Sequence, residues 1–240
     1  MARPDETPVL ILCGGRGTRL QEHTHAIPKA LVEIGGRPIV WHVVQLYLTQ
    51  GFREIVLLTG HLGEQVAQFA AAERWPDGAQ VAALDTGPDT PTGGRVQRAA
   101  ARVGGRTCCV TYADGVADID LRALLDGHTA GGLPATMTVV RPELQFGVAQ
   151  LGDGDRVTGF VEKPRSEHWV NGGFLCLDGP ALDRIGPDDV LECAPLAGLA
   201  ADGLLRAHRH EGFWDCMDTY KDAVLLTDLY ERGEAPWRRW

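Results

Sequence analysis

The first 140 residues alternate between short, fully apolar runs and longer segments with apolar residues along one face. The apolar runs have the length and composition of buried strands, and they lie at residues 9–13, 54–59, 79–84, 108–112 and 135–140. Segments with helical spacing fall between them, at residues 38–50, 63–73 and 121–130. Strands that are apolar throughout and alternate with helices predict an α/β fold with a doubly wound, mostly parallel (Rossmann-like) mixed sheet flanked by helices.

The pattern changes after residue 140. Short segments at 146–151, 156–162 and 169–177 are separated by Gly and Asp, which predicts a small antiparallel, β-rich lobe. Helices near 194–202 and 219–232 and a strand near 204–208 complete the prediction. Without a linker or a repeat, the chain is expected to be a single domain over residues 1–240, with a core at about 8–140 and the lobe and C-terminal helix at about 141–240.

Charge and composition narrow the classes of partner. The 240 residues include 23 Lys and Arg against 32 Asp and Glu, a net charge of −9. Broad binding of a phosphate backbone needs a basic face, so nucleic acid is not an expected partner, although a locally cationic pocket remains compatible. The polar N-terminus resembles no signal peptide and the apolar stretch 39–48 is too short for a bilayer, so a cytoplasmic protein is expected. The six cysteines show no C-x-x-C spacing and are expected to be reduced, structural thiols.

The clearest candidate for chemistry is the glycine-rich segment 12–20, followed by Pro28 and Lys29. Consecutive glycines let backbone N–H groups converge on an anion, and Arg19 and Lys29 add positive charge. The spacing is not that of a Walker A loop, and Leu20 occupies the third glycine position of a dinucleotide fingerprint. Without further information, a tight strand-to-helix turn with solvent-facing basic residues explains the segment as well.

Several motifs together make the chain similar to a known family. GGRGTRL at 14–20 followed by PKALVEIGGRPI at 28–39 resembles the sugar-1-phosphate nucleotidyltransferases (nucleoside-diphosphate-sugar pyrophosphorylases). The segments FGVAQL and FVEKP are similar to the sugar-binding lobe of that family. Four further segments resemble one branch of the family in particular, the cytidylyltransferases: DTGPDTPTGGR, TYADGVADID, WVNGGF and GFWDCMDTYKD. The matches run in order from residue 9 to about 237.

The resemblance implies a reaction and assigns residues to it. An oxygen of an α-sugar 1-phosphate, expected to be glucose 1-phosphate, attacks the α-phosphorus of CTP, and pyrophosphate leaves. Arg19, Lys29 and Asp114 are the implied catalytic residues, and Asp114 and Asp218 the implied ligands of Mg²⁺. The implied nucleotide site consists of Leu12, Cys13, Gly14, Gly15, Gly17, Thr18, Arg19, Lys29, Thr90, Arg95 and Ala113. The implied sugar-phosphate site consists of Gly147, Glu162, Lys163, Asn171 and Gly172.

The choice of base is expected to depend on Thr90 and Arg95, in the glycine-rich segment 85–95. Cytosine offers two adjacent acceptors, O2 and N3, and an arginine fork presents two parallel donors, whereas uracil and thymine carry a hydrogen on N3. The alternative is an exposed arginine without contact to the base. Two positions depart from the cytidylyltransferase branch, namely Ile27, where that branch carries a lysine, and Ala113, where it carries a glycine.

Other interpretations stay open at the level of sequence. Asp114 also fits a turn residue, Asp218 a helix N-cap, and Glu162 with Lys163 a surface pair at a strand end. A guanylyl-, uridylyl- or thymidylyltransferase for another hexose or heptose 1-phosphate is the first alternative function. A non-catalytic regulatory subunit that binds sugar nucleotides is the second. A homo-oligomer is compatible with either.

Overall fold

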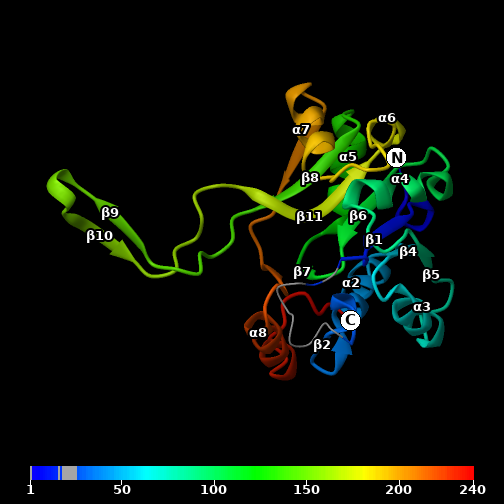
Figure 1. The fold of residues 1–240 in the computed structure, drawn as a ribbon, viewed down its shortest axis with the longest axis horizontal. Coiled ribbons are helices and arrows are strands. Elements are labelled where there is room, and N and C mark those ends of the chain that lie inside the picture. The colour runs from blue at the N-terminus through cyan, green and yellow to red at the C-terminus, as the bar shows by residue number, and fades with distance from the viewer. Residues whose placement is uncertain (1, 16, 18–25) are drawn as a thin grey trace.

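A seven-stranded sheet forms the centre of the computed structural model, which describes residues 2–15, 17 and 26–240 (Figure 1). Its strand order is β12-β8-β11-β6-β1-β4-β5. The strands are β1 (Val9–Leu12), β4 (Glu54–Thr59), β5 (Gln80–Asp85), β6 (Cys108–Tyr112), β8 (Ala135–Val140), β11 (Val170–Leu177) and β12 (Leu205–Arg209). Every neighbouring pair is parallel except the two pairs that β11 makes with β6 and β8. The predicted mostly parallel, mixed sheet is confirmed.

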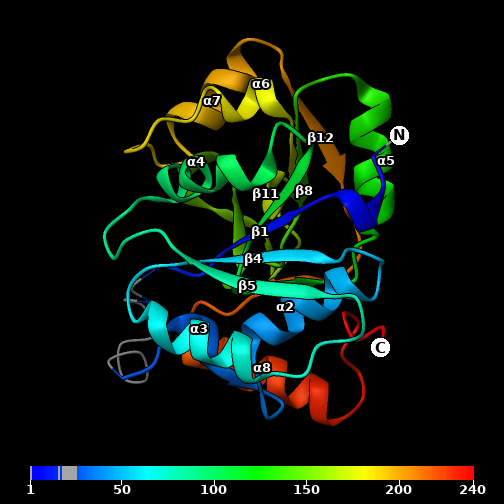
Figure 2. The same ribbon diagram turned by 90° about the vertical axis from the view of Figure 1, so that its right-hand side faces the viewer.

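Helices cover both faces of this sheet. They are α2 (Ile39–Leu48), α3 (Gly63–Ala72), α4 (Thr92–Val103), α5 (Leu121–Gly131), α6 (Gly179–Leu182), α7 (Ala194–Ala201) and α8 (Tyr220–Glu231). Figure 2 shows α4, α6 and α7 on one side of the sheet and α2, α3 and α8 on the other. Short 3-10 turns occur at η1 (Pro4–Glu6), η3 (Lys29–Leu31) and η4 (Asp153–Asp155).

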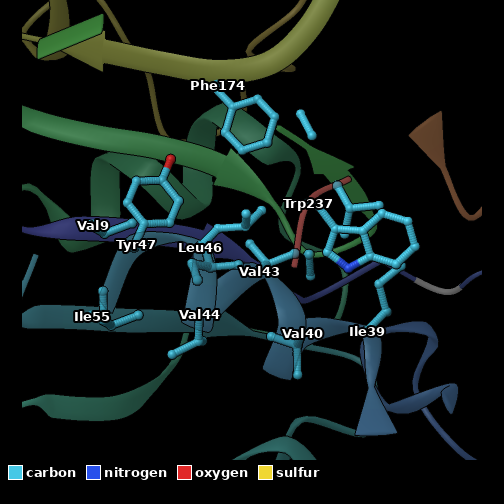
Figure 3. Close-up of a cluster of buried hydrophobic side chains, with 14 of the residues drawn as sticks. Val9, Ile39, Val40, Val43, Val44, Leu46, Tyr47, Ile55, Phe174 and Trp237 are labelled. Atoms are coloured by element: carbon cyan, nitrogen blue, oxygen red, sulfur yellow. The ribbon is translucent and has the colours of Figure 1, made fainter. Parts of the chain in front are cut away.

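The apolar runs seen in the sequence supply both faces of the core. Val9 and Ile11 of β1 pack in one cluster with α2, whereas Leu10 and Leu12 pack in another with α4, α6 and α7. Every residue of α2 is buried, and in Figure 3 its Val43 and Tyr47 lie among side chains from β1, β11 and the C-terminal segment. A central parallel strand is apolar throughout because successive side chains enter opposite clusters.

The position of β11 corrects the sequence prediction. Residues 169–177 were expected in the peripheral lobe, but β11 lies between β8 and β6 in the middle of the main sheet. Phe174 and Leu175 are buried in opposite core clusters. A short strand rich in Gly does not reveal from its own sequence which sheet it will join, because that depends on partners far away in the chain.

The expected lobe is reduced to a two-stranded arm, which we define as residues 143–165. Its strands β9 (Val148–Leu151) and β10 (Val157–Val161) pair only with each other, and Figure 1 shows the hairpin projecting away from the sheet. The arm begins at an isolated bridge between Glu143 and Arg165. Its large apolar side chains are exposed, including Phe146 at 81% and Phe160 at 64%.

Two small antiparallel pairs complete the fold. They join β2 (Glu33–Ile34) to β3 (Arg37–Pro38) and β7 (Gly115–Ala117) to β13 (Trp214–Cys216). All six cysteines are free thiols, as expected from the sequence. In the part of the chain that the structure describes, no helix combines the length and the apolar character needed to cross a membrane.

Candidate active site

An ammonium group held between two carboxylates marks the candidate site. Lys29 Nζ donates to Asp114 Oδ2 at 2.6 Å and to Asp218 Oδ1 at 2.7 Å. The three side chains are separated by 85 and 189 residues in the chain, so this contact depends entirely on the fold. The side chain of Lys29 is 17% exposed, compared with 29% for Asp114 and 36% for Asp218. The group is therefore shielded but open to a ligand from the carboxylate side.

Local structure explains how the two aspartates meet. Asp114 follows β6 after one residue, Ala113, and β7 then pairs with β13, with Gly115 opposite Cys216. This pairing brings Asp218 beside Asp114, and Met217 N donates to Asp114 O at 2.8 Å. Asp218 is not the N-cap of α8, which is Thr219 in a capping box with Asp222. The cap fixes the backbone at this point and leaves the Asp218 side chain for Lys29.

The charges in this group keep Lys29 protonated. Burial by itself lowers the pKa of Lys29, but its contacts with Asp114 and Asp218 outweigh burial and raise the pKa above 10.5. Lys29 is therefore a fixed positive charge over the whole physiological range of pH. A fixed cation suits the stabilisation of developing phosphate charge rather than proton transfer.

Lys29 and Asp114 line a cavity of about 370 Å³ at the carboxyl ends of β1 and β6, which we name the first cavity. Ligands of open α/β sheets bind at this edge. The lining includes most residues predicted to bind a nucleotide, namely Leu12, Cys13, Gly14, Gly15, Lys29, Thr90, Arg95 and Ala113. Of the other predicted residues, Gly17 adopts a positive φ of 60°, whereas Thr18 and Arg19 lie outside the described residues.

A second cavity of about 250 Å³ adjoins the first. The two cavities share Tyr112 and Asp114, and Asp218 lines the second. The second cavity also contains Asn171 and Gly172, two residues predicted to bind the sugar phosphate. The aspartates and Lys29 are thus located where the two cavities meet, between the expected nucleotide and sugar sites.

The other predicted sugar residues lie elsewhere. Gly147, Glu162 and Lys163 belong to the arm, line neither cavity, and the last two are exposed. The physical reason is that β9 and β10 pair only with each other, so no strand of the main sheet holds these residues near the site. This arrangement does not bring the predicted sugar-phosphate site together as one group.

Arg95 lines the first cavity, but the free fork expected for a base contact is absent. The sequence placed Arg95 in a loop, whereas α4 begins at Thr92 and directs the Arg95 side chain inward, where it is 4% exposed. Its Nη1 donates to Thr59 O at 2.8 Å and Gly87 O at 2.9 Å, and its Nη2 donates to Gly14 O at 3.0 Å. Burial also lowers its pKa. Arg95 therefore fixes the backbone around the cavity, and its two terminal nitrogens are already engaged.

Sequence reasoning missed some residues of the cavity walls. Thr92, Tyr112 and Val190 line the first cavity, and Trp214, which donates from Nε1 to Gly172 O at 2.8 Å, lines the second. Tyr112 was visible in the sequence as the last residue of an apolar strand, directly before Ala113 and Asp114. Val190 carried no signal, because its loop reaches the site through contacts distant in sequence, among them those with the beginning of α4.

The arrangement fits a magnesium site built from two carboxylates. Within the described ranges, no three His, Cys, Asp or Glu side chains cluster in the way a metal bound by protein alone requires. Mg²⁺ is commonly held by one or two carboxylates together with water and phosphate oxygens. Asp114 and Asp218 offer such oxygens and already bracket a positive charge. Their donor chemistry is therefore compatible with Mg²⁺ next to a phosphate ligand.

Comparison with known proteins agrees with this geometry. Residues 8–192 match the model of the nucleotidyl transferase family. A probable glucose-1-phosphate cytidylyltransferase from Bacillus subtilis (strain 168) is 36% identical, over 96% of this chain and 99% of its own length. The glucose-1-phosphate cytidylyltransferase of Salmonella typhimurium is 38% identical, over 96% and 98%. A mannose-1-phosphate guanylyltransferase from Mycobacterium tuberculosis is 28% identical, over 96% of this chain and 66% of its own.

Solved structures share the fold. HddC from Yersinia pseudotuberculosis, complexed with GMP-PN, superposes with a TM-score of 0.74 at 20% identity, over 93% of this chain and 99% of its own. A putative glucose-1-phosphate thymidylyltransferase from Bacillus anthracis gives a TM-score of 0.71 at 20% identity, over 93% and 94%. At this level of identity the likeness establishes the α/β architecture alone.

Proposed function

The chain belongs to the nucleotidyl transferase family, and on this premise we propose that it transfers CMP from CTP to a sugar 1-phosphate, with glucose 1-phosphate as the preferred acceptor. The observation that carries the proposal is the position of Lys29, held by Asp114 and Asp218 where the two cavities meet. A reaction that joins a nucleotide to a sugar phosphate has its reacting atoms at such a junction. Identity of 36–38% to cytidylyltransferases supports cytidine as the base.

The chemistry asks the protein mainly to position two anions and to offset their charge. A phosphate oxygen of the sugar 1-phosphate forms a bond to the α-phosphorus of CTP, the bond from that phosphorus to the β-phosphate oxygen breaks, and pyrophosphate leaves. In this proposal the backbone at Gly14 and Gly15 approaches the triphosphate in the first cavity. The ammonium of Lys29 stabilises the negative charge that develops on the oxygens of the α-phosphate.

The two aspartates would hold Mg²⁺, which supplies positive charge to the phosphate oxygens when bound. Without it, Asp114 and Asp218 accept hydrogen bonds from Lys29, whose positive charge lies between the two carboxylates. Asn171 and the backbone at Gly172 are suited to the sugar hydroxyls in the second cavity, because an amide offers both donors and an acceptor. Each half of the reaction thus has residues of matching chemistry.

Release of pyrophosphate tests the proposal directly. The protein is incubated with Mg²⁺, glucose 1-phosphate and each of CTP, UTP, dTTP, GTP and ATP in turn. We expect the highest kcat/KM with CTP, and we expect Asp114→Asn to abolish release while the exposed Asp188→Asn does not. Absence of release with every triphosphate contradicts transferase activity. A clear preference for another base contradicts the assignment of CTP alone.

Compartment and assembly are further parts of the proposal. Six free thiols, four of them buried, support a reducing compartment and therefore the cytoplasm. A homo-oligomer is compatible with the sequence, and light scattering during gel filtration measures the mass of the particle in solution. A mass of one chain excludes a homo-oligomer.

A further inference from the structure

A chain of hydrogen bonds crosses the wall between the two cavities, and Glu192 is its central member. Glu192 Oε2 accepts a hydrogen bond from Thr92 Oγ1 at 2.7 Å, and Glu192 Oε1 accepts one from the hydroxyl of Tyr112. The hydroxyl oxygen of Tyr112 in turn accepts from Asn171 Nδ2 at 3.3 Å. Thr92 lines the first cavity, Asn171 lines the second, and Tyr112 lines both. One carboxylate thus connects the walls of both sites.

The backbone that carries Glu192 is fixed against the beginning of α4. Leu191 N donates to Thr92 Oγ1 at 2.9 Å, and Gly94 N donates to Asp189 O at 3.1 Å. The loop passes so close that a Cβ atom on Gly94 would lie within van der Waals radii of its backbone. Glu192 therefore moves together with the first turn of α4 rather than independently of it.

The single hydroxyl proton of Tyr112 sets the direction of donation in this chain of hydrogen bonds. Because this hydroxyl donates to Glu192, its lone pairs are directed toward the Asn171 amide, whose Oδ1 accepts from Gly173 N at 2.9 Å. Without the Glu192 carboxylate, the Tyr112 hydroxyl has no acceptor in this chain of hydrogen bonds that fixes the direction of its proton.

We propose that Glu192 is a positioning residue that couples the two cavities, so that a nucleotide in the first raises the affinity of the second for a sugar 1-phosphate. A ligand that orders Thr92 orders Glu192, and through Tyr112 it orders Asn171 for the second ligand. The coupling is reciprocal, since each ligand must change the affinity of the other by the same factor. This inference rests on the proposed function, which assigns the two ligands to the two cavities.

Equilibrium binding tests the coupling apart from catalysis. The dissociation constant of α,β-methylene-CTP, which cannot transfer CMP, is measured calorimetrically with Mg²⁺ in the absence and presence of saturating glucose 1-phosphate. For the unaltered protein we expect the sugar phosphate to tighten binding about 5-fold or more, the lower end of typical coupling factors. In Glu192→Ala the factor should fall to about 1. Asp188→Ala, which removes an exposed carboxylate from the same loop, should leave the factor unchanged.

Two further variants separate coupling from a general loss of structure. Tyr112→Phe keeps the ring and removes the hydroxyl, and Thr92→Val keeps the shape and removes the other donor. Each should reduce the factor to about 1, and the double variant should lose no more, because either break interrupts the same chain. A thermal midpoint within a few degrees of the parent shows that the fold is retained.

The outcomes are distinct for the two proposals. A factor of 1 in the unaltered protein, or a full factor in Glu192→Ala, overturns the coupling even if CMP transfer is observed. If the protein instead prefers another triphosphate, the assignment of CTP fails, and the matching methylene analogue then tests Glu192 in the same way. Coupling that survives Tyr112→Phe and Thr92→Val together also overturns the role given to Glu192.

Discussion

Replacing Lys29 by methionine separates the two roles that its ammonium plays. The substitution keeps a side chain of similar length and removes the charge that lies 2.6 Å from Asp114 and 2.7 Å from Asp218. In the reaction this charge opposes the negative charge developing on the α-phosphate. Loss of one such preorganised contact typically costs about 3–4 kcal/mol of transition-state stabilisation, so kcat should fall by ~10²–10³.

In the protein without substrates, the same substitution should strengthen metal binding rather than weaken a function. Lys29 neutralises the two carboxylates that would hold Mg²⁺, so metal binding to the free protein competes with an internal cation. Without that competitor, Lys29→Met should bind Mn²⁺, a paramagnetic substitute for Mg²⁺, more tightly in titrations followed by electron paramagnetic resonance. Two adjacent carboxylates without a cation also repel each other, so metal-free Lys29→Met should unfold at a lower temperature.

The measurements are a kcat from pyrophosphate release, a dissociation constant for Mn²⁺, and a thermal midpoint. Lys221→Met is the matched control, because Lys221 is exposed on α8 and should change none of them. A kcat within about 3-fold of the parent refutes the charge contact assigned to Lys29. Weaker Mn²⁺ binding refutes the idea that its ammonium competes with the metal.

Other expectations concern the supports of the site. Arg95→Met removes the donor of hydrogen bonds to four backbone carbonyls, of which Thr59 O keeps Thr86 as a donor, so it should lower the free energy of unfolding by about 2–4 kcal/mol and weaken the binding of all triphosphates alike. A selective loss of CTP binding would instead indicate that Arg95 contacts the base. Burial lowers the pKa of His42 to about 4, below its value of 6.5 in the unfolded chain. The free energy of unfolding, measured in urea, should therefore be highest above pH 6.5 and decrease by up to ~1.4 kcal/mol per pH unit down to pH 4. A free energy that does not change over this range contradicts the expectation. Gly94→Ala should destabilise the fold by about 1–3 kcal/mol, since the new Cβ would lie 2.0 Å from Pro187 O. Gly198→Ala on α7 is the control, because its Cβ would meet nothing within 4 Å and should not destabilise the fold. Equal effects of the two substitutions in thermal unfolding would show that the close approach of Gly94 to Pro187 does not matter.

The sequence was most informative where chemistry follows directly after a buried strand. Asp114 was recognisable because it ends an apolar run, and the carboxyl ends of parallel strands form the ligand edge of such a sheet. Lys29 was recognisable from its place after the glycine-rich segment. The contact of both with Asp218 was implied only by resemblance, because it depends on the pairing of β7 with β13 across about 100 residues.

Long-range contacts explain what sequence reasoning could not reach. Arg95 was expected to contact the base from a loop, because Gly and Pro residues surround it in the sequence. In the structure, Pro91 instead precedes the first turn of α4, and the buried side chain of Arg95 donates to Gly14 O. Glu192 gave no signal at all, since its partners Thr92 and Tyr112 lie 100 and 80 residues away. Such a residue acquires its role only when the fold is complete.

The insertion of β11 between β8 and β6 has a consequence for biosynthesis. A chain that ends at residue 140 contains β1, β4, β5, β6, β8 and the glycine-rich segment, but it lacks β11, the strand that pairs with β6 and β8. Exposed apolar edges of this kind attract other chains, so the nascent protein needs protection until residue 177 has left the ribosome. We therefore expect a fragment of residues 1–140 to aggregate when expressed alone, and the apparent nucleotide half to be no independent folding unit.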